Sequence, residues 1–143
     1  MKIYVINKGP YSLPKYETSG SAGMDIKANI TDTIVLKSLE RILIPSGLYV
    51  DIPQGYEIQI RARSGLSIKK GLTLINGIGT IDSDYRGEIK IPLVNLSNDT
   101  VEINPGERVA QMVLVKHENI EFLEVEELSE TDRGKGGFGH TGI

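Results

Sequence analysis

The segment 76–88 reads NGIGTIDSDYRGE, and it concentrates polar, aromatic and turn-forming residues within thirteen positions. A strand that serves only as scaffold has no need of two aspartates in such a place. A substrate pocket can use these side chains: Asn76 to read the edge of a ring, Asp82 to accept a proton and Tyr85 to pack against a sugar. Taken alone, an aspartate at position 82 is most often a turn or cap residue, and we interpret Asp84 as structural, for instance in a pair with an arginine.

A second candidate site begins at Arg63-Ser64-Gly65, where an alternating segment gives way to a helix pattern over 64–71. We expect Ser64 to cap this helix, which ends in two lysines and a glycine. A helix N-terminus offers free backbone N–H groups and a partial positive charge. Arg63 adds a fork of donors and Ser64 a hydroxyl, so the junction suits phosphate oxygens. An ordinary helix cap with a solvated arginine is the alternative.

The C-terminal part of the chain is first acidic and then rich in glycine. Residues 118–132 contain acids but no lysine or arginine, and residues 133–142 read RGKGGFGHTG. Such a tail cannot bury a core of its own. We predict a folded domain over 1–132 and a flexible tail over 133–143 that orders on a ligand. In that tail Arg133 suits a terminal phosphate and Phe138 a stacked base, although a disordered terminus is the alternative.

The composition limits the class of protein. A chain of 143 residues fits one domain, and 39% apolar residues suffice for a core. The net charge of −3 argues against a general nucleic-acid binder. The absence of cysteine excludes disulfides and thiolate metal sites, and the two histidines form no zinc motif. Without a signal-peptide pattern or an apolar run long enough to span a bilayer, we expect a cytoplasmic protein with no membrane partner.

The rest of the chain predicts an all-β fold. Apolar and polar residues alternate in 48–52, 56–61, 88–93 and 101–103. Period-two alternation of this kind is typical of half-buried strands. Sixteen Gly and six Pro divide the chain into short pieces, with turn signals at 53–55 and 104–106. Many short strands joined by such turns indicate a sandwich or barrel, here with one short helix.

These segments resemble, in order, the five motifs of the homotrimeric deoxyuridine triphosphatases (dUTP diphosphatases). The matching stretches are AGMDIKA at 22–28, ARSGLS at 62–67, NGIGTIDSDYRG at 76–87, GERVAQMV at 106–113 and RGKGGFGHTG at 133–142. The resemblance covers residues 1–142. It implies a jelly-roll-like β-barrel with a mobile C-terminal tail. It also implies a homotrimer whose active sites are shared between subunits, each closed by the tail of another subunit.

The resemblance implies a reaction as well. Asp82 would activate the water that attacks the α-phosphorus of dUTP, giving dUMP and pyrophosphate. The enzyme would thereby supply dUMP for dTMP synthesis and keep uracil out of DNA. Mg²⁺ would be held by the triphosphate, with Asp25 reaching it through a water and no protein atom bound to it directly. This is plausible chemistry because Mg²⁺ prefers phosphate oxygens and water to an all-protein cage.

Substrate-binding roles carry over by position. Asn76 and the backbone of Thr80 and Ile81 would read uracil, and Tyr85 would pack under the deoxyribose and exclude a 2′-hydroxyl. The phosphate oxygens would be held by Arg63, Ser64 and Gly65, with Gln111 nearby, and Lys90 would lie by the nucleotide. In the tail, Arg133 would clamp the γ-phosphate, Phe138 would stack over uracil, and Gly139 is a further substrate-binding position. Two other readings stay open. One is a dCTP deaminase-like enzyme on the same fold, and the other is a non-catalytic nucleotide-binding trimer.

Overall fold

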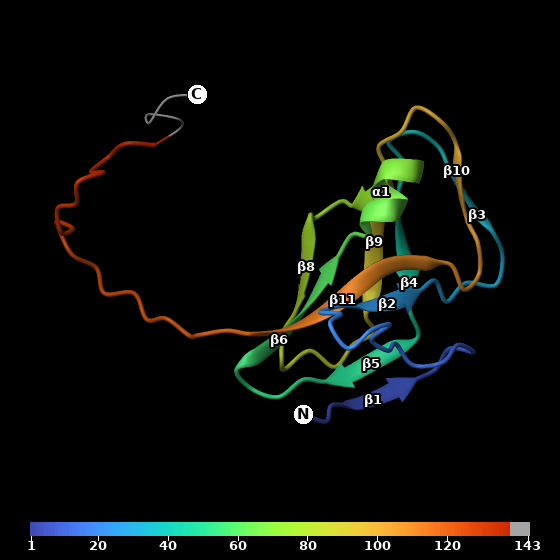
Figure 1. Ribbon diagram of the computed structural model, residues 1–143, viewed down its shortest axis with the longest axis horizontal. Helices are drawn as coiled ribbons and strands as arrows, with labels where there is room; N and C mark the ends of the chain where they lie inside the picture. Colours follow the sequence, from blue (N-terminus) through green and yellow to red (C-terminus); the bar gives the residue numbers. More distant parts are fainter. Residues whose placement is uncertain (138–143) are drawn as a thin grey trace.

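The computed structural model describes residues 1–137, in which eleven short strands accompany one helix (Figure 1). In chain order the elements are β1 (Tyr4–Asn7), β2 (Met24–Lys27), β3 (Ile34–Leu36), β4 (Arg41–Pro45), β5 (Leu48–Asp51), β6 (Tyr56–Arg61), α1 (Ser64–Lys70), β7 (Leu72–Leu74), β8 (Ile78–Ile81), β9 (Lys90–Asn95), β10 (Val101–Ile103) and β11 (Arg108–Lys116). The predicted all-β class with one short helix is confirmed.

The strands form small antiparallel sheets around a single core. The largest has the order β2-β11-β6-β8, and a second has the order β4-β9-β7. The pairs β1-β5 and β10-β3 complete the arrangement. Strand neighbours are often distant in sequence, as in β2 beside β11, which is typical of a jelly-roll-like barrel rather than a chain of simple hairpins.

The core is aliphatic and fills the space between the sheets. Its largest side chains with less than 2% exposure are Ile26, Ile44, Ile60, Leu72, Ile89, Ile91, Leu93, Ile103 and Val109. Burying each contributes about 1.5–3 kcal/mol relative to exposure. Asn95 is also fully buried. Its amide donates to the carbonyl oxygens of Leu36 and Asp99, and its oxygen accepts from the backbone and hydroxyl of Ser97, so no polar atom is left unpaired.

The alternating segments become strands, with one displacement. The runs 48–52, 56–61 and 101–103 correspond to β5, β6 and β10. The run 88–93 was expected to start a strand at Glu88, but β9 begins at Lys90 and continues to Asn95. The carboxylate of Glu88 accepts the N–H of Gly47, and the N–H of residue 89 bonds to the carbonyl of Leu48. These bonds hold the two residues in the loop, outside the ladder with β4.

The helix lies where the sequence predicts it, but its cap differs. Helix α1 begins at Ser64 itself, and the N-cap is Arg63, which makes no side-chain cap hydrogen bond. The expectation of a Ser64 cap is therefore wrong. Arg63 has an extended backbone, with φ −94° and ψ 123°, because it continues the direction of β6. The C-terminal end is as expected: Gly71 adopts a left-handed φ of 67°, and its N–H bonds to the carbonyl of Ser67.

Regular structure in the described residues ends at Lys116. From there the chain leaves the barrel as a long extended segment, drawn in orange and red in Figure 1. This segment, 117–137, carries exposed apolar side chains at Ile120, Phe122, Leu123 and Leu128. Within the described part of the chain, no helix is long and apolar enough to cross a membrane.

Candidate active site

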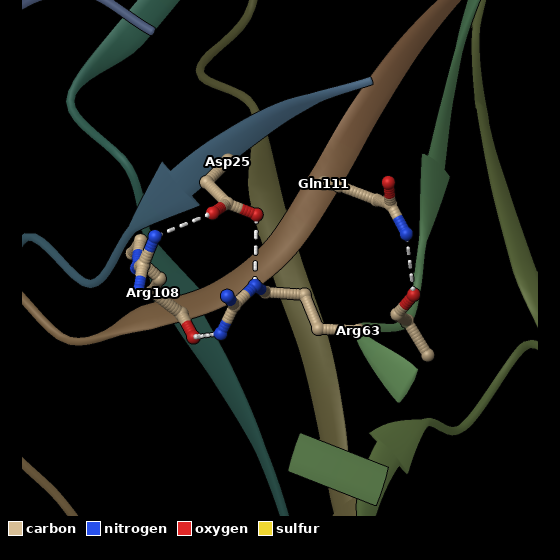
Figure 2. Close-up of polar contacts among 5 residues, drawn as sticks. Asp25, Arg63, Arg108 and Gln111 are labelled. Atoms are coloured by element: carbon tan, nitrogen blue, oxygen red, sulfur yellow. Dashed lines mark hydrogen bonds and ion pairs between the residues drawn. The ribbon is translucent and has the colours of Figure 1, made fainter. Parts of the chain in front are cut away.

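Two arginines share one aspartate at the junction of β6 and α1 (Figure 2). Nε of Arg63 donates to Oδ1 of Asp25 at 2.8 Å, and Nη1 of Arg108 donates to Oδ2 of the same carboxylate at 3.1 Å. Nη1 of Arg63 also donates to the backbone carbonyl of Arg108 at 3.1 Å. We call these three residues the arginine cluster. It carries a net positive charge on a half-exposed surface, which suits an anion.

Other predicted phosphate-binding groups lie next to the arginine cluster. Gln111 pairs across the sheet with Asp25, and its Nε2 donates to the carbonyl of Ala62 at 3.0 Å (Figure 2). Ser64 and Gly65 follow Arg63 at the exposed start of α1. A Cβ on Gly65 would meet nothing within 4 Å, so the surface there is open to a ligand. The first, second and fourth motifs therefore converge on one side of the barrel.

The third motif forms a separate group around β8, which we call the β8 hairpin (residues 76–88). The turn before β8 places the Asn76 amide beside Gly79, where Nδ2 lies 3.4 Å from the position of an added Cβ. Thr80 and Ile81 follow on the same strand, paired with Gln59 and Ile58 of β6. The predicted uracil-reading residues thus lie on β8 and on the turn that precedes it.

The far end of the β8 hairpin holds Tyr85 in a defined position. Its hydroxyl donates to the carbonyl of Glu88 at 3.0 Å, and its ring lies directly over Gly87. A Cβ at Gly87 would stand only 2.3 Å from Oη and 2.4 Å from Cζ. Tyr85 is 43% exposed, so one part of its side chain remains available for a ligand.

Asp82 is exposed at the end of β8, where it lines an open depression with Asp51, Arg86 and His117. The arginine pair that we gave as an example of a structural role for Asp84 is not formed within residues 1–137. Nη2 of Arg86 instead pairs with Asp51 at 2.7 Å, and its Nη1 donates to the carbonyl of residue 83. The strand β5 brings Asp51 within reach of Arg86, and a sequence gives no sign of this.

The arginine cluster and Asp82 lie at opposite ends of β6. Arg61 pairs with Ile78, whereas Ile58 pairs with Ile81, so Asp82 stands beside the start of β6 and Arg63 beyond its end. Along the direction of β6, the positions of Asp82 and Arg63 are six residues apart. An extended chain rises about 3.3 Å per residue, so the two residues are separated by roughly 20 Å. Figure 1 shows β8 running alongside β6 and α1 beyond it. One chain therefore does not bring these two groups onto one phosphate.

Of the remaining predicted residues, Lys90 lies against the β8 hairpin and Arg133 lies apart from both groups. Lys90 is exposed at the start of β9, with Nζ 3.9 Å from a carboxylate oxygen of Glu88. Arg133 lies in the extended C-terminal segment, where its Nε donates to the carbonyl of Gly136. Phe138 and Gly139 fall outside the described residues.

Arg108 is a site residue that sequence reasoning missed. Arg108 lies in the fourth matching stretch, where a solvent-facing strand position was the alternative to a binding role, and it was left out of the predicted substrate-binding residues. A signal was present, because Val109 and Ala110 are consecutive apolar residues directly after Arg108, where strict alternation would put a polar residue at 110. Such a break indicates a bulge, and bulges often lie next to functional sites.

Glu107, just before Arg108, fixes the start of β11 to the helix. Nζ of Lys70 donates to its carboxylate, and the backbone N–H of Asn104 donates to the other oxygen at 3.0 Å. Burial acts to raise the pKa of Glu107, but the hydrogen bonds from Lys70 and Asn104 and the charge of Lys70 outweigh it. The pKa of Glu107 is therefore lowered from its ordinary value.

Comparison with known proteins identifies the family. The dUTPase family model matches residues 10–142. A deoxyuridine 5′-triphosphate nucleotidohydrolase of Finegoldia magna is 66% identical, with 99% of each chain covered. A protein of the same name from Fusobacterium nucleatum is 62% identical over 99% of this chain and 97% of the relative. Among solved structures, a Staphylococcus bacteriophage 80alpha dUTPase with dUPNHPP has a TM-score of 0.89 at 28% identity, with 99% of each chain covered.

The fold and the site thus define a jelly-roll-like β enzyme, a hydrolase of the nucleotide diphosphatase class. More particularly, the chain belongs to the dUTPase family, because the family model spans nearly all of it and the curated relatives match it from end to end. The resemblance found in the sequence is confirmed.

Proposed function

We propose that this protein hydrolyses dUTP to dUMP and pyrophosphate, through water activated by Asp82. The observation that carries the proposal is the arginine cluster. One carboxylate holds two guanidiniums there, beside the exposed start of α1. The excess positive charge and the unused N–H groups suit a triphosphate, because phosphoryl transfer depends on positioning and charge neutralisation.

In the proposed reaction, the oxygen of a water forms a bond to the α-phosphorus. The bond from that phosphorus to the bridging oxygen breaks, and pyrophosphate leaves. Asp82 accepts the proton of the attacking water, a role for which an exposed carboxylate at the end of β8 is accessible. Arg63, Ser64, Gly65 and Gln111 hold the phosphate oxygens.

The β8 hairpin would select the nucleoside. Asn76 and the backbone of Thr80 and Ile81 offer hydrogen bonds to the edge of uracil. A pocket built on backbone groups discriminates strongly, since the wrong base edge leaves buried donors or acceptors unpaired. Tyr85 would pack under the deoxyribose, and Lys90 would lie close to the nucleotide.

A site shared between copies explains the separation of its parts. Because Asp82 and Arg63 of one chain lie at opposite ends of β6, the proposed site takes one of them from a second copy. The C-terminal segment extends away from its own barrel and exposes apolar side chains, which supports docking on another copy (Figure 1). We propose a homotrimer in which Arg133, Phe138 and Gly139 close a neighbouring site.

The proposed metal is Mg²⁺. A phage phi11 dUTPase structure is described with a structural Mg(II) ion. Within residues 1–137 no group of three or more acidic, histidine or cysteine side chains could hold a metal. Both oxygens of Asp25 already accept guanidinium N–H groups, which fits an ion held by phosphate oxygens and reached from Asp25 through water. Bound there, the ion would neutralise charge on the triphosphate.

The first test is pyrophosphate release with Mg²⁺ from dUTP, with dTTP, dCTP and UTP measured in parallel. Release from dUTP alone is the expected result. Ammonia release from dCTP would favour the deaminase reading, and binding of dUTP without turnover would favour a non-catalytic trimer.

A second test addresses the shared site. Alone, the Asp82→Asn chain is expected to be nearly inactive, and the Arg63→Gln chain to keep about 1–10% of the wild-type kcat/KM. Co-expressed, they form mixed assemblies in which some sites combine an intact Asp82 with an intact Arg63, so activity should reappear. If the mixture is no more active than the separate variants, the site is complete within one chain.

A further inference from the structure

We infer that Arg108 is a positioning residue, which acts through Asp25 to hold the Arg63 guanidinium toward the substrate's phosphates. The inference rests on the proposed function, because it concerns the same anion site. It assigns a task to a side chain outside the predicted substrate contacts, and it explains an irregularity in β11.

The irregularity is a one-residue bulge between β11 and β2. Gln111 pairs with Asp25 and Ala110 with Ile26, but Arg108 pairs with Lys27, leaving Val109 as an extra residue. Val109 and Ala110 are both buried, with 1% and 0% exposure. Two consecutive inward residues break the alternation of the strand.

The bulge decides which way Arg108 faces. Cross-strand partners share a face of a sheet, and Lys27 lies two residues from Asp25, on the same face. In a regular ladder Arg108 would oppose Ala28, which is buried at 0% exposure. The extra residue therefore moves Arg108 from the core face to the face that carries Asp25 and Gln111, as Figure 2 shows.

On that face, Arg108 fixes Asp25 and Arg63 together. Its Nη1 donates to Oδ2 of Asp25, which leaves Oδ1 for Nε of Arg63. Its carbonyl accepts Nη1 of Arg63 at 3.1 Å. Arg63 is thus held at two of its nitrogens, while Nη2 has no partner within residues 1–137. A long side chain restrained in this way loses less freedom on binding an anion, which is the advantage of preorganisation.

The exposure of the three side chains agrees with this division of roles. Asp25 and Arg63 are 22% and 26% exposed, whereas Arg108 is 51% exposed. The Asp25–Arg63 pair is the more enclosed contact, and Arg108 supports it from the solvent side. An isolated exposed ion pair contributes little to stability, but a carboxylate bound by two guanidiniums has a defined orientation.

The test is a double-mutant cycle on kcat/KM for dUTP, measured by pyrophosphate release. The variants are Arg63→Gln, Arg108→Gln and the double variant. We expect Arg63→Gln to lower kcat/KM about 10- to 100-fold, as for loss of a charged hydrogen bond. Arg108→Gln should cost about tenfold, as for a misplaced contact. If Arg108 acts through Arg63, the double variant should be no worse than Arg63→Gln, to within about twofold.

Two further variants complete the experiment. Arg108→Lys keeps one donor for Oδ2 and should recover activity to within about threefold of the wild type. Lys37→Gln removes one positive charge from an exposed position outside the arginine cluster and should leave kcat/KM unchanged. Thermal unfolding of every variant establishes that each is folded at the assay temperature.

The inference would be overturned if the fold-decrease in kcat/KM of the double variant equalled the product of the two single decreases. Arg108 would then contact phosphate itself or serve the fold alone. If Arg108→Gln does not fold, the cycle is run with Arg108→Met, and failure of both to fold would likewise overturn it. A wild-type protein that releases no pyrophosphate would overturn the proposed function, and the inference with it. An active wild type with multiplying losses would overturn the inference alone.

Discussion

Substituting Gly87 with alanine should impair nucleotide selection with little effect on the fold. The Tyr85 ring lies over Gly87, and a Cβ there would stand 2.3 Å from Oη, 2.4 Å from Cζ and 2.9 Å from Cε2. Ordinary contact between such atoms needs about 3.5 Å, so the ring must move by about 1 Å. The movement would also strain the bond from Oη to the Glu88 carbonyl, worth about 0.5–1.5 kcal/mol.

The substitution should lower activity and not the stability of the fold, because the Tyr85 ring is 43% exposed and can turn toward solvent. The backbone φ of Gly87 is not in the left-handed region, so alanine is compatible with the local conformation. A displacement of about 1 Å at a substrate-contacting group can cost about 100-fold in rate. We therefore expect kcat/KM for dUTP to fall about 10- to 100-fold and the preference for dUTP over UTP to narrow.

The assay compares pyrophosphate release from dUTP and UTP in the wild type, Gly87→Ala, Tyr85→Ala and the double variant. Once the ring is absent, the added methyl group has nothing to displace. Gly87→Ala should therefore have little further effect in the Tyr85→Ala background. The reasoning would be refuted if Gly87→Ala kept full activity and selectivity, or if its loss were equally large without Tyr85.

Three further predictions concern catalysis, the tail and stability. Asp82→Asn should keep affinity for a non-hydrolysable dUTP analogue, measured by calorimetry, and lose about 10²- to 10⁴-fold in kcat; unchanged turnover would exclude Asp82 as the base. Deleting residues 133–143 should leave the proposed trimer folded by light scattering and thermal unfolding but nearly inactive, since the role proposed for the tail is that of a lid; full activity would contradict that role. The lowered pKa of Glu107 stabilises the fold above its unfolded pKa of about 4.3, and this contribution is lost as pH falls through the folded value. Glu107→Gln should therefore cost about 0.5–1 kcal/mol at pH 7 and little once the pH lies below the folded pKa, as measured by denaturant titrations. An equal cost at both pH values would exclude the Lys70 pairing as its cause.

The strand segments could be predicted because their cause is local. In β6, the alternation of Tyr56–Arg61 directly gives one buried and one solvent-facing side, and the observed strand has those bounds. The helix position was predictable from its pattern, but the cap was not. Arg63 takes the cap position because its backbone remains extended at the end of β6.

The site was predictable in its residue types and less so in its arrangement. Arg63 was expected to hold phosphate and Asp25 to reach the metal through a water, but Arg108 was not among the predicted substrate-binding residues. Its role depends on a bulge that only strand pairing reveals. For Asp84 an arginine pair was one example of a structural role, yet Arg86 turns to Asp51, which a different strand supplies.

The sequence by itself determined the class of fold, the chemical groups available and the family to which they belong. These follow from local facts: side-chain chemistry, the period of the apolar pattern and the turn preferences of glycine and proline. The tertiary structure alone decided which groups meet. Asp25 bonds to residues 38 and 83 positions away, through pairings that bring β2, β6 and β11 together. The same pairings place Asp82 and Arg63 at opposite ends of β6, because register is set by packing across the whole barrel and not by neighbours in the chain.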